Sequence, residues 1–324
     1  MSSLSAGTAQ DLVTALLNEG DWSAEEFGAG RFSQTFRVTG PGGQHVLRVA
    51  PPDSVRQLFY EHRMMRQEPG IHARLLAETD VPIPPILAHD FSRDRIDRDY
   101  LLMPLLPGTP LSEAGLAPDA KARALREWGR HVAKIHTITD PAGRFGYLGE
   151  HECMTPRASW PEAFAEMYRR ELVDIVACGI YDQATADTAF ELLDKHLPSF
   201  GQCDTPHLLH GDLWVTNLLV NPDGAVTGVI DFDRACWGDV EWDLAIAEYC
   251  DVTQPAFWDG YGLLVETHQG EAAIRRMFYL LYEHQKYIVI SMSIRRDDPA
   301  GARRYARESL AVMDNFRRTG EPAF

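Results

Sequence analysis

The chain has 324 residues, of which 45% are hydrophobic and 24% are charged, as is typical of a globular protein with one large domain or two ordinary ones. Its formal net charge of −16 argues against a nucleic-acid partner, which would need a basic surface. The sequence has no long uninterrupted apolar run, so we expect no membrane span.

The N-terminus and the cysteines indicate a cytoplasmic protein. The first residues lack a basic segment followed by an apolar one, so we expect no signal peptide. The 5 cysteines are scattered and form no Cys-x-x-Cys motif, which favours reduced thiols. The negative charge either attracts a cationic substrate by long-range steering or simply serves solubility, and both interpretations stay open.

The first third of the chain predicts a mixture of helices and strands. Gly20 ends an apolar helical pattern, and Arg48 interrupts the apolar positions of a short strand. Pro69 and Gly70 are expected to kink or split the second helix. In chain order, the predicted elements are a helix over 8–20, a strand over 45–50, a helix over 54–77, an extended segment over 82–90 and a strand over 100–108.

The rest of the chain is predicted to be mainly helical, except for one polar stretch between two helical groups. The apolar face of its longest helix is interrupted by Glu283, Lys286 and Tyr287. The predicted helices cover 118–137, 160–178, 182–197, 242–250, 261–265, 272–294 and 302–317.

The polar stretch, 210–243, predicts a β-hairpin that gathers acidic and amide side chains at one end. Two apolar strands, 218–220 and 226–230, flank the turn Asn221-Pro222-Asp223-Gly224. Asp212 and Asn217 precede the first strand, and Asp231 follows the second. Because antiparallel pairing brings those two ends together, we expect these three side chains to converge.

These residue types suit phosphoryl transfer. That reaction needs a carboxylate to orient and deprotonate a hydroxyl, and oxygen ligands for Mg²⁺ at the phosphates. Asp212 is the predicted base, and Asn217 and Asp231 are the predicted metal ligands. A catalytically inactive nucleotide-binding module and a metal-dependent phosphoester hydrolase are the alternatives from other functional classes.

The motifs of this stretch resemble the aminoglycoside phosphotransferase family, whose relatives include fructosamine kinase and choline kinase. The resemblance implies an α+β, two-lobed protein-kinase-like fold, with a small antiparallel-sheet N-lobe over 1–104 and a larger, mainly helical C-lobe over 105–324. Compared with protein kinases, Gly211 replaces an arginine and Asp233 a glycine. The matching residues are His210-Gly211-Asp212, Asn217, Ile230-Asp231-Phe232 and Gly238-Asp239.

The resemblance also implies a site for ATP, with GTP not excluded. Arg48 would contact the phosphates and pair with a glutamate, for which we prefer Glu68 to Glu61, expecting Glu61 to be a solvated helix residue. His210, Asp239 and Asp243 are expected to brace the catalytic loop. The other predicted nucleotide-binding residues are Gly28, Gly30 and Ser33 in a glycine loop, and the backbone of Leu102, Met103 and Leu105 for adenine.

The acceptor is a small molecule with a hydroxyl group, for which the acidic chain slightly favours a cationic compound. Asp233 and Glu241 are the predicted acceptor-binding residues. The resemblance favours an antibiotic or amino sugar, with a role in resistance or self-protection. The alternative is a metabolic kinase of the fructosamine, choline or homoserine type; Trp214 fits a fructosamine kinase, whereas Val215-Thr216 departs from its pattern.

Overall fold

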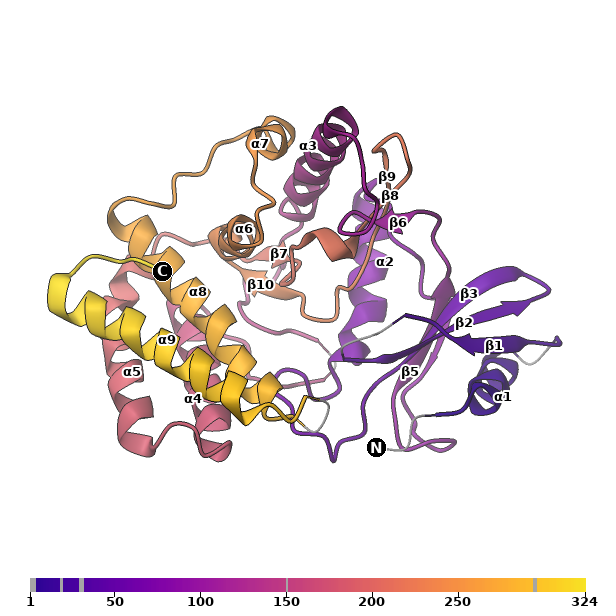
Figure 1. Cartoon of the computed structure of the whole chain (residues 1–324), viewed down its shortest axis with the longest axis horizontal. Coiled ribbons are helices and arrows are strands. Elements are labelled where there is room, and N and C mark those ends of the chain that lie inside the picture. Colours follow the sequence, from indigo (N-terminus) through magenta and orange to yellow (C-terminus); the bar gives the residue numbers. More distant parts are fainter. Residues whose placement is uncertain (1–3, 18–19, 29–31, 150, 294–295) are drawn as a thin grey trace.

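In a computed structural model, which describes residues 4–17, 20–28, 32–149, 151–293 and 296–324, an antiparallel sheet lies at one end of the molecule and helices make up the other (Figure 1). The sheet has 5 strands in the order β1-β2-β3-β5-β4. Its strands are β1 (Ser23–Glu26), β2 (Gln34–Gly40), β3 (Gly43–Val49), β4 (Ala88–Asp90) and β5 (Tyr100–Pro104).

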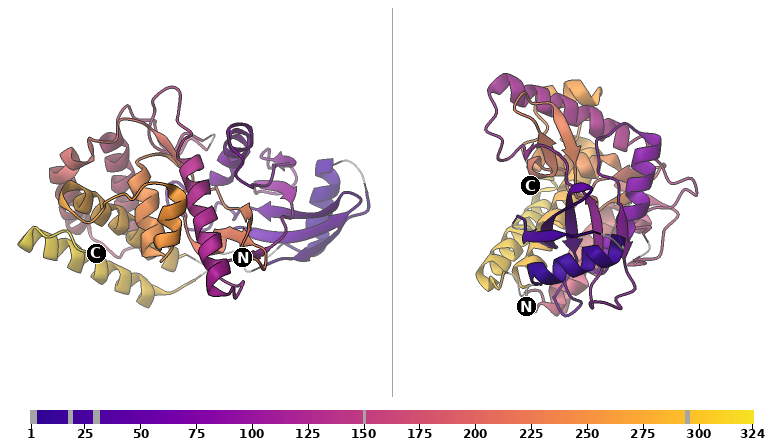
Figure 2. Two further views of the ribbon diagram at one scale, coloured as in Figure 1. Left: turned by 90° about the horizontal axis from the view of Figure 1, so that it is seen from above. Right: turned by 90° about the vertical axis from the view of Figure 1, so that its right-hand side faces the viewer.

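The alternation of side chains along β3 gives the sheet two different faces. Leu47 and Val49 are fully buried against Phe36 and Val38 of β2, beneath helix α1 (Ala6–Leu17), which lies against the strands in Figures 1 and 2. Successive residues of a strand point to opposite faces. Arg48, between those two residues, therefore points away from α1 and toward the rest of the molecule.

The segment predicted as a helix over 54–77 is helical only in its last part, so the prediction for 54–63 was wrong. Turns precede a short 3₁₀ helix, η1 (Met64–Gln67), and helix α2 begins only at Glu68 and ends at Glu78. Pro69 stands in the first turn of α2, where its missing N–H costs no hydrogen bond. The proline thus starts this helix instead of kinking it.

The helical end is built from the C-terminal two thirds of the chain. Helix α7 ends at Tyr261, where Gly262 takes a left-handed φ of 83°, so the predicted helix over 261–265 was wrong. The helices are α3 (Pro118–Ile135), α4 (Trp160–Ala177), α5 (Gln183–His196), α6 (Val240–Tyr249), α7 (Pro255–Tyr261), α8 (Gly270–Ser291) and α9 (Pro299–Thr319), with the 3₁₀ helix η2 (Leu197–Phe200). No helix among the described residues is long and apolar enough to span a bilayer.

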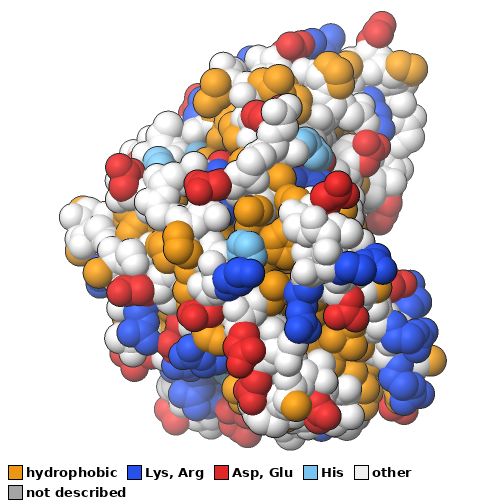
Figure 3. Space-filling model, turned by 90° about the vertical axis from the view of Figure 1, so that its left-hand side faces the viewer, with side chains coloured by type: hydrophobic (Ala, Val, Ile, Leu, Met, Phe, Trp, Pro, Cys, Tyr) orange, Lys and Arg blue, Asp and Glu red, His pale blue; other side chains and the backbone are white. Residues whose placement is uncertain are grey.

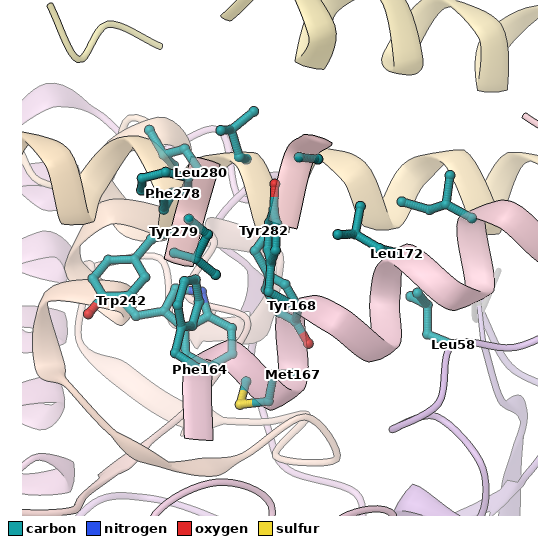
Figure 4. Packing of buried hydrophobic residues seen from close by; sticks show 14 of the residues in the cluster. Leu58, Phe164, Met167, Tyr168, Leu172, Trp242, Phe278, Tyr279, Leu280 and Tyr282 are labelled. Carbon is teal, nitrogen blue, oxygen red and sulfur yellow. The ribbon is translucent and has the colours of Figure 1, made fainter. Parts of the chain in front are cut away.

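An aromatic core holds these helices together (Figure 4). Phe164 of α4 lies 5.1 Å, ring centroid to ring centroid, from Tyr279 of α8, and Trp242 of α6 lies 5.4 Å from Tyr282. All four side chains are fully buried. Because aromatic rings bury large areas, this core fixes α6 and α8, which both approach the site described below.

Two glycines let α3 and α7 pack backbone to backbone. A Cβ on Gly260 of α7 would lie 1.8 Å from the carbonyl oxygen of Arg126, and one on Gly129 of α3 would lie 2.1 Å from that of Phe257. We therefore expect Gly260→Ala to lower the free energy of unfolding by about 2 kcal/mol or more, measured by urea denaturation. Gly70→Ala, which meets no described atom within 4 Å, is the control and should leave stability unchanged or slightly raised.

Short elements form the predicted hairpin and the strand pairs around it. β8 pairs antiparallel with β9, as predicted, and β8 also pairs with β6, just after the sheet. β7 pairs with β10, which places the chain before the hairpin beside the chain after it. These elements are β6 (Thr109–Pro110), β7 (His207–Leu209), the 3₁₀ helix η3 (Val215–Asn217), β8 (Leu218–Val220), β9 (Val226–Val229) and β10 (Cys236–Gly238).

Candidate active site

A cavity of about 780 Å³ separates the sheet from the helices. The sheet contributes Val46, Arg48 and Met103 to its wall, and α8 contributes Glu283 and Lys286. The hairpin closes it from a third side with Asp212, Asn217, Leu219 and Asp231. Such a cavity, apolar with a few convergent polar groups, is typical of small-molecule sites.

The structure brings Asp212, Asn217 and Asp231 together at this cavity. The Nδ2 of Asn217 donates to the backbone carbonyl oxygen of Asp212 and to its Oδ2, both at 3.0 Å. The N–H of Ile230 donates to the carbonyl oxygen of Asn217 at 3.1 Å. This bond places Asp231, the next residue along the chain, beside Asn217. The carboxylate of Asp231 is 38% exposed, so it remains accessible from the cavity.

The loop that carries Asp212 is held by α6. Asp243 accepts hydrogen bonds from the backbone N–H of His210 at 2.7 Å and of Gly211 at 2.8 Å. The ring of His210 lies 3.1 Å from the carbonyl oxygen of Ile230 and packs on Phe232. A backbone held at several points by a rigid helix positions its side chain well.

Gly211 is required by the path of the backbone. Its φ is 77°, in the left-handed region, and a Cβ would lie 2.4 Å from the carbonyl oxygen of Arg234. Both features exclude a larger side chain, which explains the departure from the arginine of protein kinases. Asp231 also has a left-handed φ, of 73°; such strain in a residue other than glycine is concentrated at functional sites.

Arg48 ties the sheet to the end of the hairpin. Its guanidinium donates to Glu68 at 2.6 Å, to Asp231 at 2.9 Å and to Asp233 at 3.0 Å. Burial would lower the pKa of Arg48, but the three carboxylates raise it above its ordinary value, so the cation is retained. Asp233 therefore lies on the sheet side of the cavity, beside Asp231. Burial, together with repulsion from Asp231, raises the pKa of Asp233.

Two predicted roles in the helical part were wrong. Glu241 is buried in a bidentate ion pair with Arg275 of α8, at 2.8 and 2.9 Å, because the first turn of α6 directs it toward that helix. Glu241 thus lies in the protein interior and does not face an acceptor. Asp239 caps α6 by accepting from the N–H of Glu241 and also accepts from Tyr279 Oη. It supports the helix, whereas Asp243 braces the loop.

Two of the three residues predicted to contact adenine reach the cavity. Met103 and Leu105 line the cavity. Leu102 is fully buried in the sheet, and its carbonyl oxygen accepts from Leu87 at 2.8 Å, so that prediction was wrong. The N–H of Leu105 already donates to the carbonyl oxygen of Gln44 at 3.0 Å. Strand pairing thus occupies backbone groups of Leu102 and Leu105 that the sequence predicted to contact adenine.

The predicted glycine loop also reaches the cavity. Gly28 and Ser33 line it, and Gly28 has a left-handed φ of 74°. The hydroxyl of Ser33 is buried without a hydrogen-bond partner among the described residues, which leaves a donor for a ligand oxygen. Gly30 lies outside the described residues.

Glu61, expected to be a solvated helix residue, is part of a turn instead. Its carboxylate accepts from the N–H of Leu58 at 2.8 Å, and it lines the cavity. Burial raises its pKa. This correction follows from the late start of α2, because a turn leads the Glu61 side chain inward.

The sequence predictions missed a network of charged side chains that joins Arg234 to Glu283 and Lys286 of α8. Arg234 donates to Asp212 Oδ1 at 3.3 Å and to Glu283 Oε1 at 3.4 Å, and Lys286 donates to Glu283. Burial alone would raise the pKa of Asp212, but the charges of Arg234 and Lys286 hold it below its usual range. The sequence feature that could have indicated this network was the interruption of an apolar helical pattern by Glu283 and Lys286.

The donor set around Asp231 fits a magnesium ion. Because the Nδ2 of Asn217 is used by Asp212, its Oδ1 is the atom left to bind a cation. Amide and carboxylate oxygens are the ligands that Mg²⁺ prefers. Among the described residues, no three His, Cys, Asp or Glu side chains converge in a metal-binding arrangement. A bound Mg²⁺ would therefore take its remaining ligands from water and nucleotide phosphates.

The fold and the site define a member of a phosphotransferase family. Residues 23–276 match the family described as "Phosphotransferase enzyme family" (APH), and the chain belongs to it. Among curated proteins, it is 32% identical over 174 residues to "Probable ketoamine kinase YniA" of Escherichia coli (strain K12), covering 51% of this chain and 55% of that protein. The chain thus spans about half the length of the curated relatives it matches.

Solved structures have the same fold. A "putative fructosamine-3-kinase" from Haemophilus somnus 129PT superposes with a TM-score of 0.65 at 17% identity, covering 93% of this chain and 96% of that one. The aminoglycoside phosphotransferase APH(4)-Ia gives 0.64 at 18% identity, covering 95% and 99%. The α+β, two-lobed kinase-like fold predicted from the sequence is confirmed.

Proposed function

We propose that the protein is a small-molecule kinase that transfers the γ-phosphoryl group of ATP to a hydroxyl of a ketoamine, a sugar joined to an amine. The antibiotic acceptor expected from the sequence gives way to its metabolic alternative, because the curated relatives are named ketoamine kinases. The observation that carries the reaction type is the carboxylate of Asp212, held by Asn217 at a cavity shared with Asp231 and Arg48.

In the proposed reaction, Asp212 accepts the proton of the acceptor hydroxyl as that oxygen bonds to the γ-phosphorus. The bond between this phosphorus and the β–γ bridging oxygen breaks, and ADP leaves. The low pKa of Asp212 keeps it ionised and able to orient the hydroxyl. A magnesium ion on Asn217 and Asp231 would neutralise phosphate charge when bound.

The nucleotide would lie against the sheet. Arg48 and the hydroxyl of Ser33, which has no partner among the described residues, would contact phosphates, and the segment from Met103 to Leu105 would border the adenine. Asp233, expected to bind the acceptor, belongs to this side because it shares Arg48 with Asp231. We retain the division into lobes at 104/105, since β5 ends at Pro104 and the next strand pairs with the hairpin.

A panel assay of ADP release tests the proposal. We expect turnover of fructosyl or ribulosyl ketoamines with MgATP, and kcat/KM at least about tenfold lower for kanamycin and hygromycin B. The reverse preference would restore the antibiotic acceptor. A metal-dependent hydrolase would instead release phosphate from p-nitrophenyl phosphate without any nucleotide. An inactive module would bind ATP and turn over nothing.

A further inference from the structure

Several cations line the cavity on and near α8, although the chain as a whole carries a net charge of −16. Here we build on the proposed function and ask which acceptor fits. Figure 3 shows acidic and basic side chains interspersed over the helical end of the molecule, so the acidity is not gathered there into one patch. Away from the cluster around Arg48, the charged residues lining the cavity are Arg56, Arg234, Lys286 and Arg296, against Glu61, Asp212, Glu283 and the exposed Glu113.

Three of these four carboxylates already have partners. Glu283 accepts from Arg234, from Lys286 and from the indole N–H of Trp242. Glu61 accepts a hydrogen bond from a backbone N–H, and Asp212 binds the acceptor hydroxyl in the proposed reaction. A cationic acceptor would therefore find little unpaired negative charge here.

Lys286 is the cation best placed to receive an acceptor. It lines the cavity but is only 5% exposed, and its ammonium has three donors, of which Glu283 takes one. Burial and Arg234 lower its pKa, but Glu283 raises it above the ordinary value. The ring of Tyr287 lies 5.2 Å from its Nζ and 5.8 Å from the guanidinium carbon of Arg296. Two cations thus flank one aromatic wall of the cavity.

We propose that the acceptor carries a carboxylate, which Lys286 binds together with Arg296 beside Tyr287, near the hydroxyl that Asp212 deprotonates. Arg234 contacts both Asp212 and Glu283, and Glu283 contacts Lys286. One small acceptor can therefore reach Lys286 with its carboxylate and Asp212 with its hydroxyl. The substrate class is then the ketoamine of a free amino acid, in which the carboxylate lies close to the amine. A ketoamine of a neutral amine lacks the group that this end of the cavity would bind.

Two acceptors that differ only in this group test the proposal: fructosylglycine, and fructosylglycinamide, whose carboxylate is a neutral amide. The wild-type enzyme should prefer fructosylglycine by at least about tenfold in kcat/KM. Lys286→Gln should raise KM for fructosylglycine by about 10- to 100-fold, the effect of losing a hydrogen bond between charged groups. Because Lys286 also lowers the pKa of Asp212, kcat should change to the same extent with both acceptors, whereas KM for the amide should stay within about threefold. Lys286→Arg should retain the preference.

Lys195→Gln, at the exposed end of α5, is the matched control and should change neither constant. Equal use of the two acceptors by the wild-type enzyme would overturn the proposal. So would an unchanged preference for fructosylglycine in Lys286→Gln, because that result means that Lys286 does not bind the carboxylate. If Lys286→Gln does not fold, as judged by circular dichroism, the wild-type preference and Lys286→Arg decide.

A binding measurement separates this proposal from the proposed function. With AMP-PNP and Mg²⁺ present, calorimetry should show binding of D-gluconate and at least tenfold weaker binding of D-sorbitol, its uncharged counterpart. Lys286→Gln should remove that difference. If no ketoamine is turned over but gluconate binds in this way, the ketoamine activity is wrong and the carboxylate site stands. Equal binding of the two probes would overturn the site.

Discussion

Asp212→Asn should lower kcat by about 10²- to 10⁴-fold, the usual contribution of a general base, with little effect on nucleotide affinity. The substitution keeps the size of the side chain and a contact with Asn217, but an amide cannot accept the proton of the acceptor hydroxyl. Steady-state ADP release with a ketoamine measures kcat, and titration with AMP-PNP measures nucleotide binding.

Asp223→Asn is the matched control, because this exposed aspartate lies in the turn of the same hairpin. It should leave kcat unchanged. Retention of more than a tenth of wild-type turnover by Asp212→Asn would remove Asp212 from its proposed role. Loss of AMP-PNP binding in the same variant would mean that the substitution disturbs the cavity as a whole.

Arg48→Ala should reduce both activity and stability. Glu68, Asp231 and Asp233 would lose the cation that they share. The negative charge of Glu68, which is fully buried, would then no longer be balanced by Arg48. We expect the free energy of unfolding to fall by about 3 kcal/mol, as when one partner of a buried ion pair is removed. We also expect kcat/KM for ATP to fall by at least about 100-fold, since a charge facing the phosphates is lost. Urea denaturation and initial rates over a range of ATP concentrations measure the two effects.

Two further substitutions separate charge from geometry at this position. Arg48→Lys keeps the charge but loses the planar fork that serves several carboxylates at once, so it should fall between wild type and Arg48→Ala in both measurements. Arg126→Ala removes an exposed ion pair with Asp259 and should change stability by less than about 1 kcal/mol. An Arg48→Ala protein as stable and active as wild type would contradict the importance of the cluster.

The hairpin and its polar ends were predictable from the sequence because they depend on local rules. A turn of Asn221-Pro222-Asp223-Gly224 between two short apolar strands sets the register, and this register brings Asp231 beside Asn217. The pairing of Arg48 with Glu68 was also anticipated, although Glu68 proved to begin its helix instead of lying within it.

The errors arose where tertiary contacts outweigh local preference. Residues 54–63 have a helical pattern, yet they form turns that lead Glu61 into the cavity. Glu241 stands close to the motif in sequence, but its partner, Arg275, is 34 residues away, and no local pattern predicts that pair. The same limit hid the contact between Arg234 and Glu283, which are 49 residues apart.

Helix α8 serves two purposes with residues that lie next to one another on its surface. Phe278, Tyr279 and Tyr282 belong to the aromatic core, whereas Glu283, Lys286 and Tyr287 border the cavity. Residues three, four and seven apart share one side of a helix, so Lys286 adjoins Tyr279 and Tyr282 and the two sets are coupled. Substitutions at the cavity positions would therefore alter which compounds are accepted and would also change the melting temperature. Divergence of selectivity among enzymes built on this scaffold is expected to concentrate at such positions.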